Sequence, residues 1–160
     1  MIISIGDRVP VATLKKMGPS GPEEFSTSEF FAGRKVVLFA VPGAFPPTCS
    51  NKHLPGFVEQ AGQIKAKGVD AIACMSVNDA FVMDAWGKDR QVGDNVEMLA
   101  DGSAEFTKAM GLELDLTVTG LGIRSRRFAM VVDDGVVTVL KLEVAGGFDV
   151  SSAESILMAL

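Results

Sequence analysis

The sequence predicts an α/β fold in which helices flank a mixed central sheet, and three observations support this prediction. Near-continuous apolar runs at residues 35–41 and 70–77 have the composition of strands that are buried on both faces. An amphipathic stretch of helical period follows each run, and this alternation is typical of parallel strands. Asp133-Asp134-Gly135 is a strong hairpin turn signal that adds antiparallel strands near the C-terminus.

Length and composition fit one compact domain spanning residues 1–160. The chain is 48% hydrophobic, and 15 Lys and Arg against 20 Asp and Glu give a formal net charge of −5. This balance disfavours disorder, and an acidic chain without a basic patch disfavours nucleic-acid binding. No apolar run approaches the ~18 residues of a membrane span. The N-terminus lacks the basic and long apolar regions of a signal peptide, so we expect a cytoplasmic protein.

The N-terminal segment contains short elements separated by turn residues. Strand-like pieces at residues 11–14 and 24–25 flank a Gly- and Pro-rich stretch, residues 15–22, which predicts a turn or loop. Residues 26–29, Ser-Thr-Ser-Glu, have the spacing of a capping box and predict a short helix, which Gly33 ends.

Helices alternate with strands through the middle of the chain. After the strand at 35–41, one apolar stripe predicts a helix over residues 48–67, and Pro55-Gly56 predicts a kink or an irregular first turn in it. Asn78 or Asp79 caps the next helix, which is expected to run to about residue 88. Three residues are expected on its buried face: Val82, Ala85 and Trp86.

The remaining elements complete a β-α-β-α-β-α-β-β-α order. They are a short strand (96–99), a short helix (103–110), hairpin strands (127–132 and 136–142) and a final helix opened by a capping box (151–154). A partly parallel sheet with helices on both faces and a terminal antiparallel hairpin is the pattern of a thioredoxin-like fold. No linker or second domain is expected.

Two cysteines, Cys49 and Cys74, are the first residues to consider for a chemical role. They cannot form a disulfide framework, there is no Cys-x-x-Cys motif, and a single His leaves no His-rich metal site. Cys49 follows a buried strand and lies in the predicted first turn of a helix, where free N–H groups and the helix dipole favour a thiolate. Position alone leaves two interpretations open, a reactive thiolate or an inert buried thiol.

The segment around Cys49 resembles the active-site loop of the type II peroxiredoxins. Residues 42–50 read Pro-Gly-Ala-Phe-Pro-Pro-Thr-Cys-Ser, and the match continues through residues 53–57. Further stretches resemble the same subfamily, so that the resemblance covers essentially the whole chain: residues 76–83, 99–103, 111–115 and 124–132. It implies a thioredoxin fold and an antioxidant enzyme that reduces hydrogen peroxide and organic hydroperoxides with a thiol, without metal or other cofactor.

The resemblance assigns roles to individual residues. Cys49 becomes the peroxidatic cysteine, which peroxide oxidises to a sulfenic acid. Arg127 becomes the cation that faces it, whereas the residues alone favour a surface cation beside Arg124 and Arg126. Pro42 matches the family proline that packs over the cysteine, and Gly43 can let backbone N–H groups approach the peroxide. Thr48 and Ser50 are nearby hydroxyls, but neither has the family register.

Pro46 departs from the family pattern. The family usually has Thr or Ser three residues before the cysteine, and proline offers neither a hydroxyl nor an N–H. Loss of one preorganised donor typically costs on the order of 10²-fold in rate. An alternative hypothesis is therefore a turnover-impaired redox sensor of the same fold. A disulfide reductase is disfavoured by the missing Cys-x-x-Cys.

The resemblance also bears on partners. Some type II members have a resolving cysteine near the C-terminus, but residues 150–153 here read Val-Ser-Ser-Ala. Cys74 lies in a predicted strand core, so we expect an external reductant: glutathione, glutaredoxin or thioredoxin.

Apolar residues in loops or at a helix start, Phe45, Phe81 and Leu121, suggest a homodimer. His53 can tune the thiolate or bind a carboxylate, or it can be a polar residue at the pocket rim.

Overall fold

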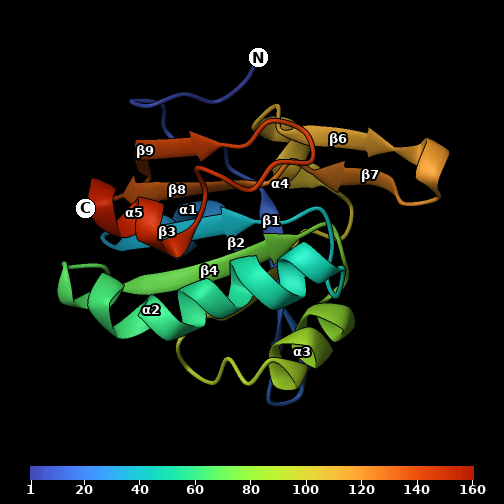
Figure 1. The fold of residues 1–160 in the computed structure, drawn as a ribbon, viewed down its shortest axis with the longest axis horizontal. Helices are drawn as coiled ribbons and strands as arrows, with labels where there is room; N and C mark the ends of the chain where they lie inside the picture. Colours follow the sequence, from blue (N-terminus) through green and yellow to red (C-terminus); the bar gives the residue numbers. More distant parts are fainter.

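The computed structural model describes residues 1–160, whose centre is a seven-stranded mixed sheet in the order β2-β1-β5-β4-β3-β8-β9 (Figure 1). The strands are β1 (Thr13–Gly18), β2 (Gly21–Ser26), β3 (Lys35–Ala40), β4 (Ala71–Ser76), β5 (Glu97–Ala100), β8 (Phe128–Asp133) and β9 (Val136–Leu142). The helices are α1 (Thr27–Phe31), α2 (Leu54–Ala66), α3 (Ala80–Asp89), α4 (Glu105–Ala109) and α5 (Ala153–Ala159), with a π-helical turn, η1 (Cys49–His53), before α2.

Strand direction in the sheet matches the predicted thioredoxin-like pattern. β3 pairs parallel with β4, and β4 pairs parallel with β5. On its other side β3 pairs antiparallel with β8, which forms a hairpin with β9. The centre of the sheet therefore combines local parallel pairs with a long-range antiparallel pair, and that antiparallel pair carries the segment before β8 to the C-terminal end of β3.

Two hydrophobic cores lie on opposite faces of the sheet because alternate residues of a strand point to opposite sides. Val37 and Phe39 of β3 belong to the core under α2, α3 and α5, which Figure 1 shows in front of the sheet. Val36 and Leu38 belong to the core under α1, α4 and the N-terminal segment. The prediction that this strand is buried on both faces is confirmed, since Val36–Ala40 are fully buried.

Two strand pairs differ from the sequence-based expectation. Most of the predicted loop at residues 15–22 belongs instead to the β1–β2 hairpin, in which only Pro19 and Ser20 lie outside the strands. A second, two-stranded sheet, β6 (Glu113–Leu116) and β7 (Gly122–Ser125), is joined by the 3₁₀ turn η2 (Thr117–Thr119) and extends away from the main sheet (Figure 1). Its strands pair antiparallel.

Helix ends follow the capping signals with small shifts. Asp79 caps α3 by accepting a hydrogen bond from the Val82 N–H at 2.9 Å. The last helix is capped by Ser152, one residue after the predicted cap. Ala85 is exposed, contrary to the prediction, because the buried face of α3 is centred instead on Met83 and Trp86.

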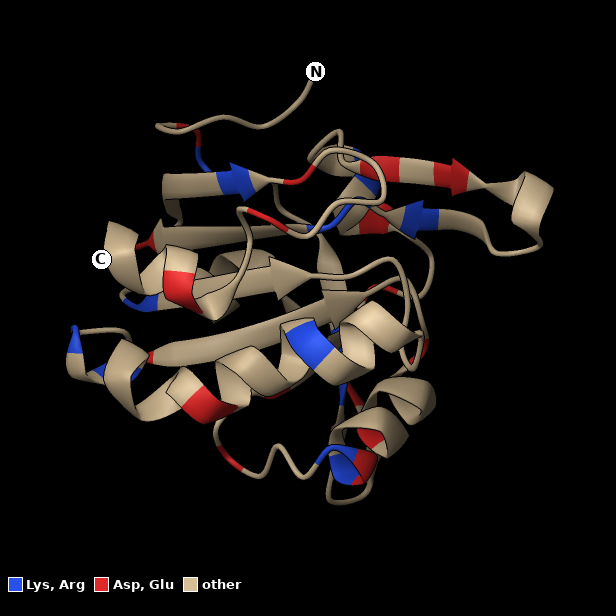
Figure 2. Cartoon of the chain, in the orientation of Figure 1, with Lys and Arg blue, Asp and Glu red and all other residues tan.

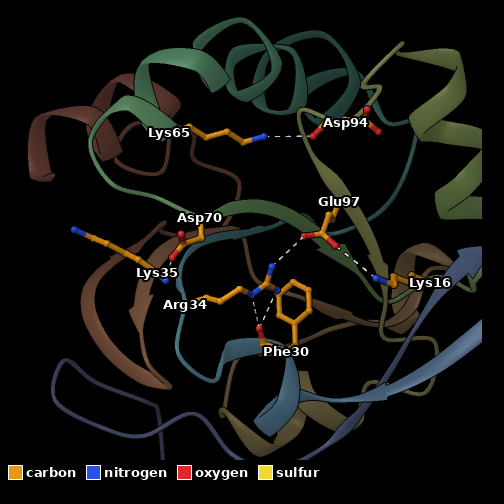
Figure 3. Close-up of polar contacts among 8 residues, drawn as sticks. All are labelled: Lys16, Phe30, Arg34, Lys35, Lys65, Asp70, Asp94 and Glu97. Atoms are coloured by element: carbon orange, nitrogen blue, oxygen red, sulfur yellow. Dashed lines mark hydrogen bonds and ion pairs between the residues drawn. The ribbon is translucent and has the colours of Figure 1, made fainter.

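Polar contacts at the N-terminal ends of the parallel strands are structural. Arg34 donates two hydrogen bonds to the Phe30 carbonyl, and Glu97 lies between Arg34 and Lys16 at 3.9 and 3.6 Å (Figure 3). Asp70 accepts from the Lys35 N–H at 2.8 Å. These partly exposed ion pairs contribute little individually. Together with the hydrogen bonds of Arg34 and Asp70, they connect the N-terminal ends of the parallel strands, away from the carboxyl ends.

Charge is dispersed over the chain. Figure 2 shows Lys and Arg interspersed with Asp and Glu. No helix has the length and the apolar character needed to cross a bilayer.

Candidate active site

Cys49 lies at the carboxyl end of the central strand β3, where α/β folds place functional groups. The loop of residues 41–46 leads from β3 to two helical residues, Pro47 and Thr48, and Cys49 is the first residue of the π-helical turn that follows. Cys49 is buried, with only 1% of its surface exposed to solvent. The Pro55-Gly56 pair predicted an irregular first turn, and the π-helical turn is that irregularity. A sulfur held here is shielded from bulk water.

Arg127 reaches Cys49 from the start of β8, the strand that pairs antiparallel with β3. It precedes β8, whose antiparallel register pairs Phe128 with Ala40 at the end of β3. Its Nη2 donates a hydrogen bond to the Cys49 Sγ at 3.0 Å, across 78 residues of sequence. The guanidinium also lies 5.8 Å from the centre of the Phe148 ring, which covers it. The structure therefore brings these two predicted residues into direct contact.

His53 is fully buried beside them and does not lie at the pocket rim. Its Nδ1 is 2.8 Å from Arg127 Nη1, and its Nε2 is 2.9 Å from the Ser151 carbonyl oxygen. Arginine has only donors, so Nδ1 accepts and Nε2 carries the proton. With both nitrogens engaged, no donor remains for an incoming carboxylate.

The electrostatics keep His53 neutral. Burial is the main cause that lowers its pKa to about 3, and the Arg127 charge acts in the same direction. The hydrogen bond to Ser151 and the Glu143 charge oppose this shift without outweighing it. Phe39 and Phe148, each with its ring centre 4.9 Å from the imidazole, supply apolar surroundings. The imidazole thus acts as a neutral acceptor for the arginine.

The predicted substrate residues line the site unequally. Pro42 and Thr48 are half-buried and line, with Arg127, a cavity of about 190 Å³. Gly43 is buried, and a Cβ there would lie 2.7 Å from Arg124 Nη1, which donates to the Pro42 carbonyl at 3.2 Å. Pro46 is exposed and does not line the cavity, although its carbonyl accepts from the Ser50 N–H at 2.9 Å.

Cys74 is fully buried on β4, and no disulfide joins it to Cys49. Burial raises the pKa of the Cys74 thiol well above its ordinary value, and Cys49 adds to the rise, while Arg127 opposes it. The thiol form dominates, and a neutral buried thiol is a poor nucleophile.

Several residues of the site carried no signal in the sequence. Ser50 Oγ accepts from Trp86 Nε1 at 2.9 Å, which ties α3 to the π-helical turn. Glu143 lies in a segment without a recognisable motif, and the sequence marks Ser151 only as part of a capping box, yet the Ser151 carbonyl accepts from His53 and Glu143 accepts from the Ser151 hydroxyl. Only the four-residue spacing of His53 from Cys49 pointed toward this cluster.

Comparisons with known proteins identify the family of the chain. The Redoxin family model matches residues 4–157, so fold and site define a thiol-redox protein of thioredoxin type. The chain is 58% identical over 163 residues to Peroxiredoxin-2E-2, chloroplastic, of Oryza sativa subsp. japonica, which covers 99% of this chain and 72% of the relative. The structure of reduced Prx3 in complex with H₂O₂ from Vibrio vulnificus matches with a TM-score of 0.95 at 54% identity, covering 99% of each chain. The chain belongs to the peroxiredoxin family, as a member of type II, and is a thiol-dependent peroxidase.

The same comparisons contradict the expected cytoplasmic location. Peroxiredoxin-2E, chloroplastic, of Arabidopsis thaliana is 56% identical over 162 residues, covering 99% of this chain and 69% of the relative. Both plant relatives are named chloroplastic. The expectation rested on composition and on the N-terminal residues. Composition is set by folding and solubility, which do not distinguish one aqueous compartment from another.

Proposed function

We propose that Cys49 is the peroxidatic cysteine and that Arg127 activates it. The observation that carries this proposal is the 3.0 Å contact from Arg127 Nη2 to Cys49 Sγ at a sulfur that is almost fully buried. A permanent cation at this distance stabilises the thiolate, which is the nucleophilic form. Its planar set of donors also serves the peroxide oxygens as negative charge moves onto them.

The proposed reaction has two halves. The thiolate sulfur attacks the hydroxyl oxygen of a hydroperoxide, an S–O bond forms as the O–O bond breaks, and the leaving alkoxide takes a proton to become an alcohol. With hydrogen peroxide the leaving group becomes water. Cys49 is oxidised to a sulfenic acid. An external thiol then displaces water to form a mixed disulfide, and a second thiol releases Cys49 as it forms the reductant's own disulfide.

The cavity beside Arg127 is the proposed peroxide site. Pro42 and Thr48 line it together with Arg127. The proposed role of the proline is to limit access of water to the sulfur, and that of Thr48 is to place its hydroxyl near the incoming substrate. Gly43 lets the loop backbone pack closely against Arg124. Pro46 occupies the loop position at which the family usually carries a hydroxyl, so Thr48 is the proposed hydroxyl donor in its place.

An external thiol is the proposed reductant, because Cys74 is unsuited to resolve the sulfenic acid. It is fully buried in the central strand β4 and its thiol form is favoured. Movement of this strand would disrupt its pairs with β3 and β5. Glutathione, glutaredoxin and thioredoxin are the proposed thiol sources.

Single cysteine variants test the nucleophile and the reductant together. We expect Cys49→Ser to abolish turnover of peroxide with added thiol, and Cys74→Ser to retain most of it, since only Cys49 contacts Arg127. Peroxide consumption with glutathione and glutaredoxin, or with thioredoxin, is the measurement, and circular dichroism checks folding. Equal loss in two folded variants would refute the assignment, and loss in Cys74→Ser alone would make Cys74 the resolving residue.

We also propose that residues 1–160 form one domain that assembles as a homodimer. Phe45, Phe81 and Leu121 are 47%, 65% and 44% exposed, and apolar side chains gathered on one surface mark protein–protein contact sites. Arg124 links two of these regions, since it donates to the Leu121 and Pro42 carbonyls. The proposed interface therefore borders the active-site loop.

Sedimentation tests the dimer. Phe81→Ser is expected to shift the protein from twice 16.9 kDa to 16.9 kDa, because it removes the most exposed of the three apolar side chains. Met158→Ser, at a still more exposed apolar position on α5 (88% against 65%), is the control. A wild-type protein that sediments as a monomer at micromolar concentration would refute this interface.

A further inference from the structure

Glu143 is a buried carboxylate that lines the proposed peroxide cavity but has no part in the bond changes of the proposed reaction. It follows β9 and is only 3% exposed. Its Oε2 accepts from the Val150 N–H at 2.9 Å, from the Ser151 N–H at 2.8 Å and from the Ser151 hydroxyl at 2.7 Å. The Asp149 N–H, 2.9 Å from Oε2, is shared with Oε1. No cation forms a salt bridge with it, so these four donors satisfy its charge.

These bonds define the shape of the segment between β9 and α5. Residues 143–152 contain neither helix nor strand, and Gly146 and Gly147 make the segment conformationally permissive. Burial of the carboxylate raises its pKa, but the hydrogen bonds from Asp149, Ser151 and Val150 outweigh this effect and lower the pKa of Glu143. Hydrogen bonds to an ionised acceptor are about twice as strong as neutral ones. The anion therefore holds residues 149–151 in one conformation.

The Ser151 carbonyl passes this constraint to the active site. It accepts from His53 Nε2, so the imidazole carries its proton there and presents the Nδ1 lone pair to Arg127. Arg127 uses Nη1 for that contact and Nη2 for Cys49. If the carbonyl moved away, the Nδ1–H tautomer would become accessible, and an imidazole N–H would then face a guanidinium N–H. Two donors in this position repel, which would displace the arginine from the sulfur.

We propose that Glu143 is a positioning residue for peroxide reduction: its carboxylate holds the Ser151 carbonyl that fixes the His53 tautomer and so aims Arg127 at Cys49. This inference rests on the proposed roles of Cys49 and Arg127. It adds a residue whose carboxylate hydrogen-bonds only to residues 149–151 and that acts on Cys49 through two other side chains, His53 and Arg127.

The tautomer of His53 can be read directly, because the chain contains a single histidine. In ¹⁵N-labelled wild-type protein, NMR correlation of the ring nitrogens with the ring protons is expected to show a protonated Nε2 and an unprotonated Nδ1 near neutral pH. Glu143→Ala removes all four hydrogen bonds and is expected to give a mixture of tautomers. Its peroxide rate is expected to fall by roughly 10-fold or more, which is the size of loss seen when a hydrogen-bond partner that orients a metal ligand is removed.

Two further variants separate positioning from general structure. Glu143→Gln keeps a neutral acceptor, so it is expected to retain the Nε2–H tautomer and to recover much of the rate lost in Glu143→Ala. It also keeps the test available if the alanine variant does not fold. Glu154→Gln removes the same charge at an exposed position of α5 and is expected to match wild type in tautomer and rate.

The outcomes distinguish this inference from the proposed function. A single Nε2–H tautomer together with a wild-type peroxide rate in folded Glu143→Ala would overturn the positioning role. So would a rate loss without any change in tautomer. Failure of the Cys49 assignment is seen separately, as peroxide turnover in Cys49→Ser. The tautomer measurement needs no activity and remains informative in that case.

Discussion

One guanidinium joins the first and last residues of the π-helical turn. Arg127 donates to Cys49 through Nη2 and contacts His53 through Nη1, so the two side chains four residues apart share one cation. The sequence on its own favours a surface role for Arg127, because Arg124 and Arg126 are its neighbours. Only the family resemblance pointed to the site, since the contact depends on the pairing of β8 with β3, which local sequence does not encode.

Pro46→Thr is expected to raise the second-order rate with peroxide by roughly 10-fold or more, if one hydrogen-bond donor is restored near the reacting atoms. The fold should change little, because Pro46 is exposed and contributes its carbonyl to the Ser50 N–H, a contact that threonine keeps. Stopped-flow kinetics give the rate. Pro47→Thr, at the adjacent exposed proline, is the matched control and should leave the rate near wild type. A Pro46→Thr rate equal to that of the control would show that a hydroxyl at residue 46 adds nothing, either because Thr48 or Ser50 already supplies one or because this pocket does not use one.

At the scale of elements, α3 is attached to the active-site turn by a buried hydrogen bond. Trp86 is fully buried, and its Nε1 donates to Ser50 Oγ. The Phe45 ring packs near the same indole, with ring centres 6.3 Å apart. The helix therefore supports both the residue after Cys49 and the loop before it.

Trp86→Phe is expected to lower the free energy of unfolding by about 1–3 kcal/mol, because the ring loses its N–H and leaves a buried hydroxyl without its donor. Urea unfolding measures this change. Ser50→Ala and the double variant complete a cycle that isolates the hydrogen bond from the lost ring volume. Strictly additive effects in that cycle would mean that the Trp86–Ser50 contact contributes nothing to stability.

How far the sequence predicts an element depends on what stabilises it. The strand at 35–41 is recognisable because burial on both faces demands an apolar run. The pair β6–β7 is harder to predict. Residues 112–116, Leu-Glu-Leu-Asp-Leu, do alternate as a half-buried strand does, but the partner Gly122–Ser125 carries no such pattern. Glu143 illustrates the general limit, since its importance comes from donors that a folded loop brings to it.

For the whole molecule, His53 makes stability depend on pH. Its pKa is about 3 in the folded protein and 6.5 when unperturbed, so the unfolded chain binds more protons between these values. Stability is therefore expected to fall as pH drops below about 6.5, by about 2 kcal/mol between about pH 7 and pH 5. Urea unfolding at the two pH values measures the difference.

The matched comparison is His53→Gln, which removes the titrating group. Glu143 acts in the same direction, because its lowered pKa makes stability fall as pH drops below 4.5, but this occurs in a more acidic range. The His53→Gln protein should accordingly lose most of the dependence between about pH 5 and 7. An unchanged dependence in this variant would show that His53 is not the group responsible.

The sheet order has a consequence for how the protein is made. β3 lies in the first quarter of the chain, whereas its neighbour β8 begins at Phe128. Cys49 follows β3 and Arg127 precedes β8, so their contact depends on the pairing of these two strands. Such a distant contact forms late, because a long loop must close first. During synthesis the sulfur leaves the ribosome long before its cation. A nascent chain therefore carries an unpartnered thiol, and the activated nucleophile is assembled only when the sheet is completed.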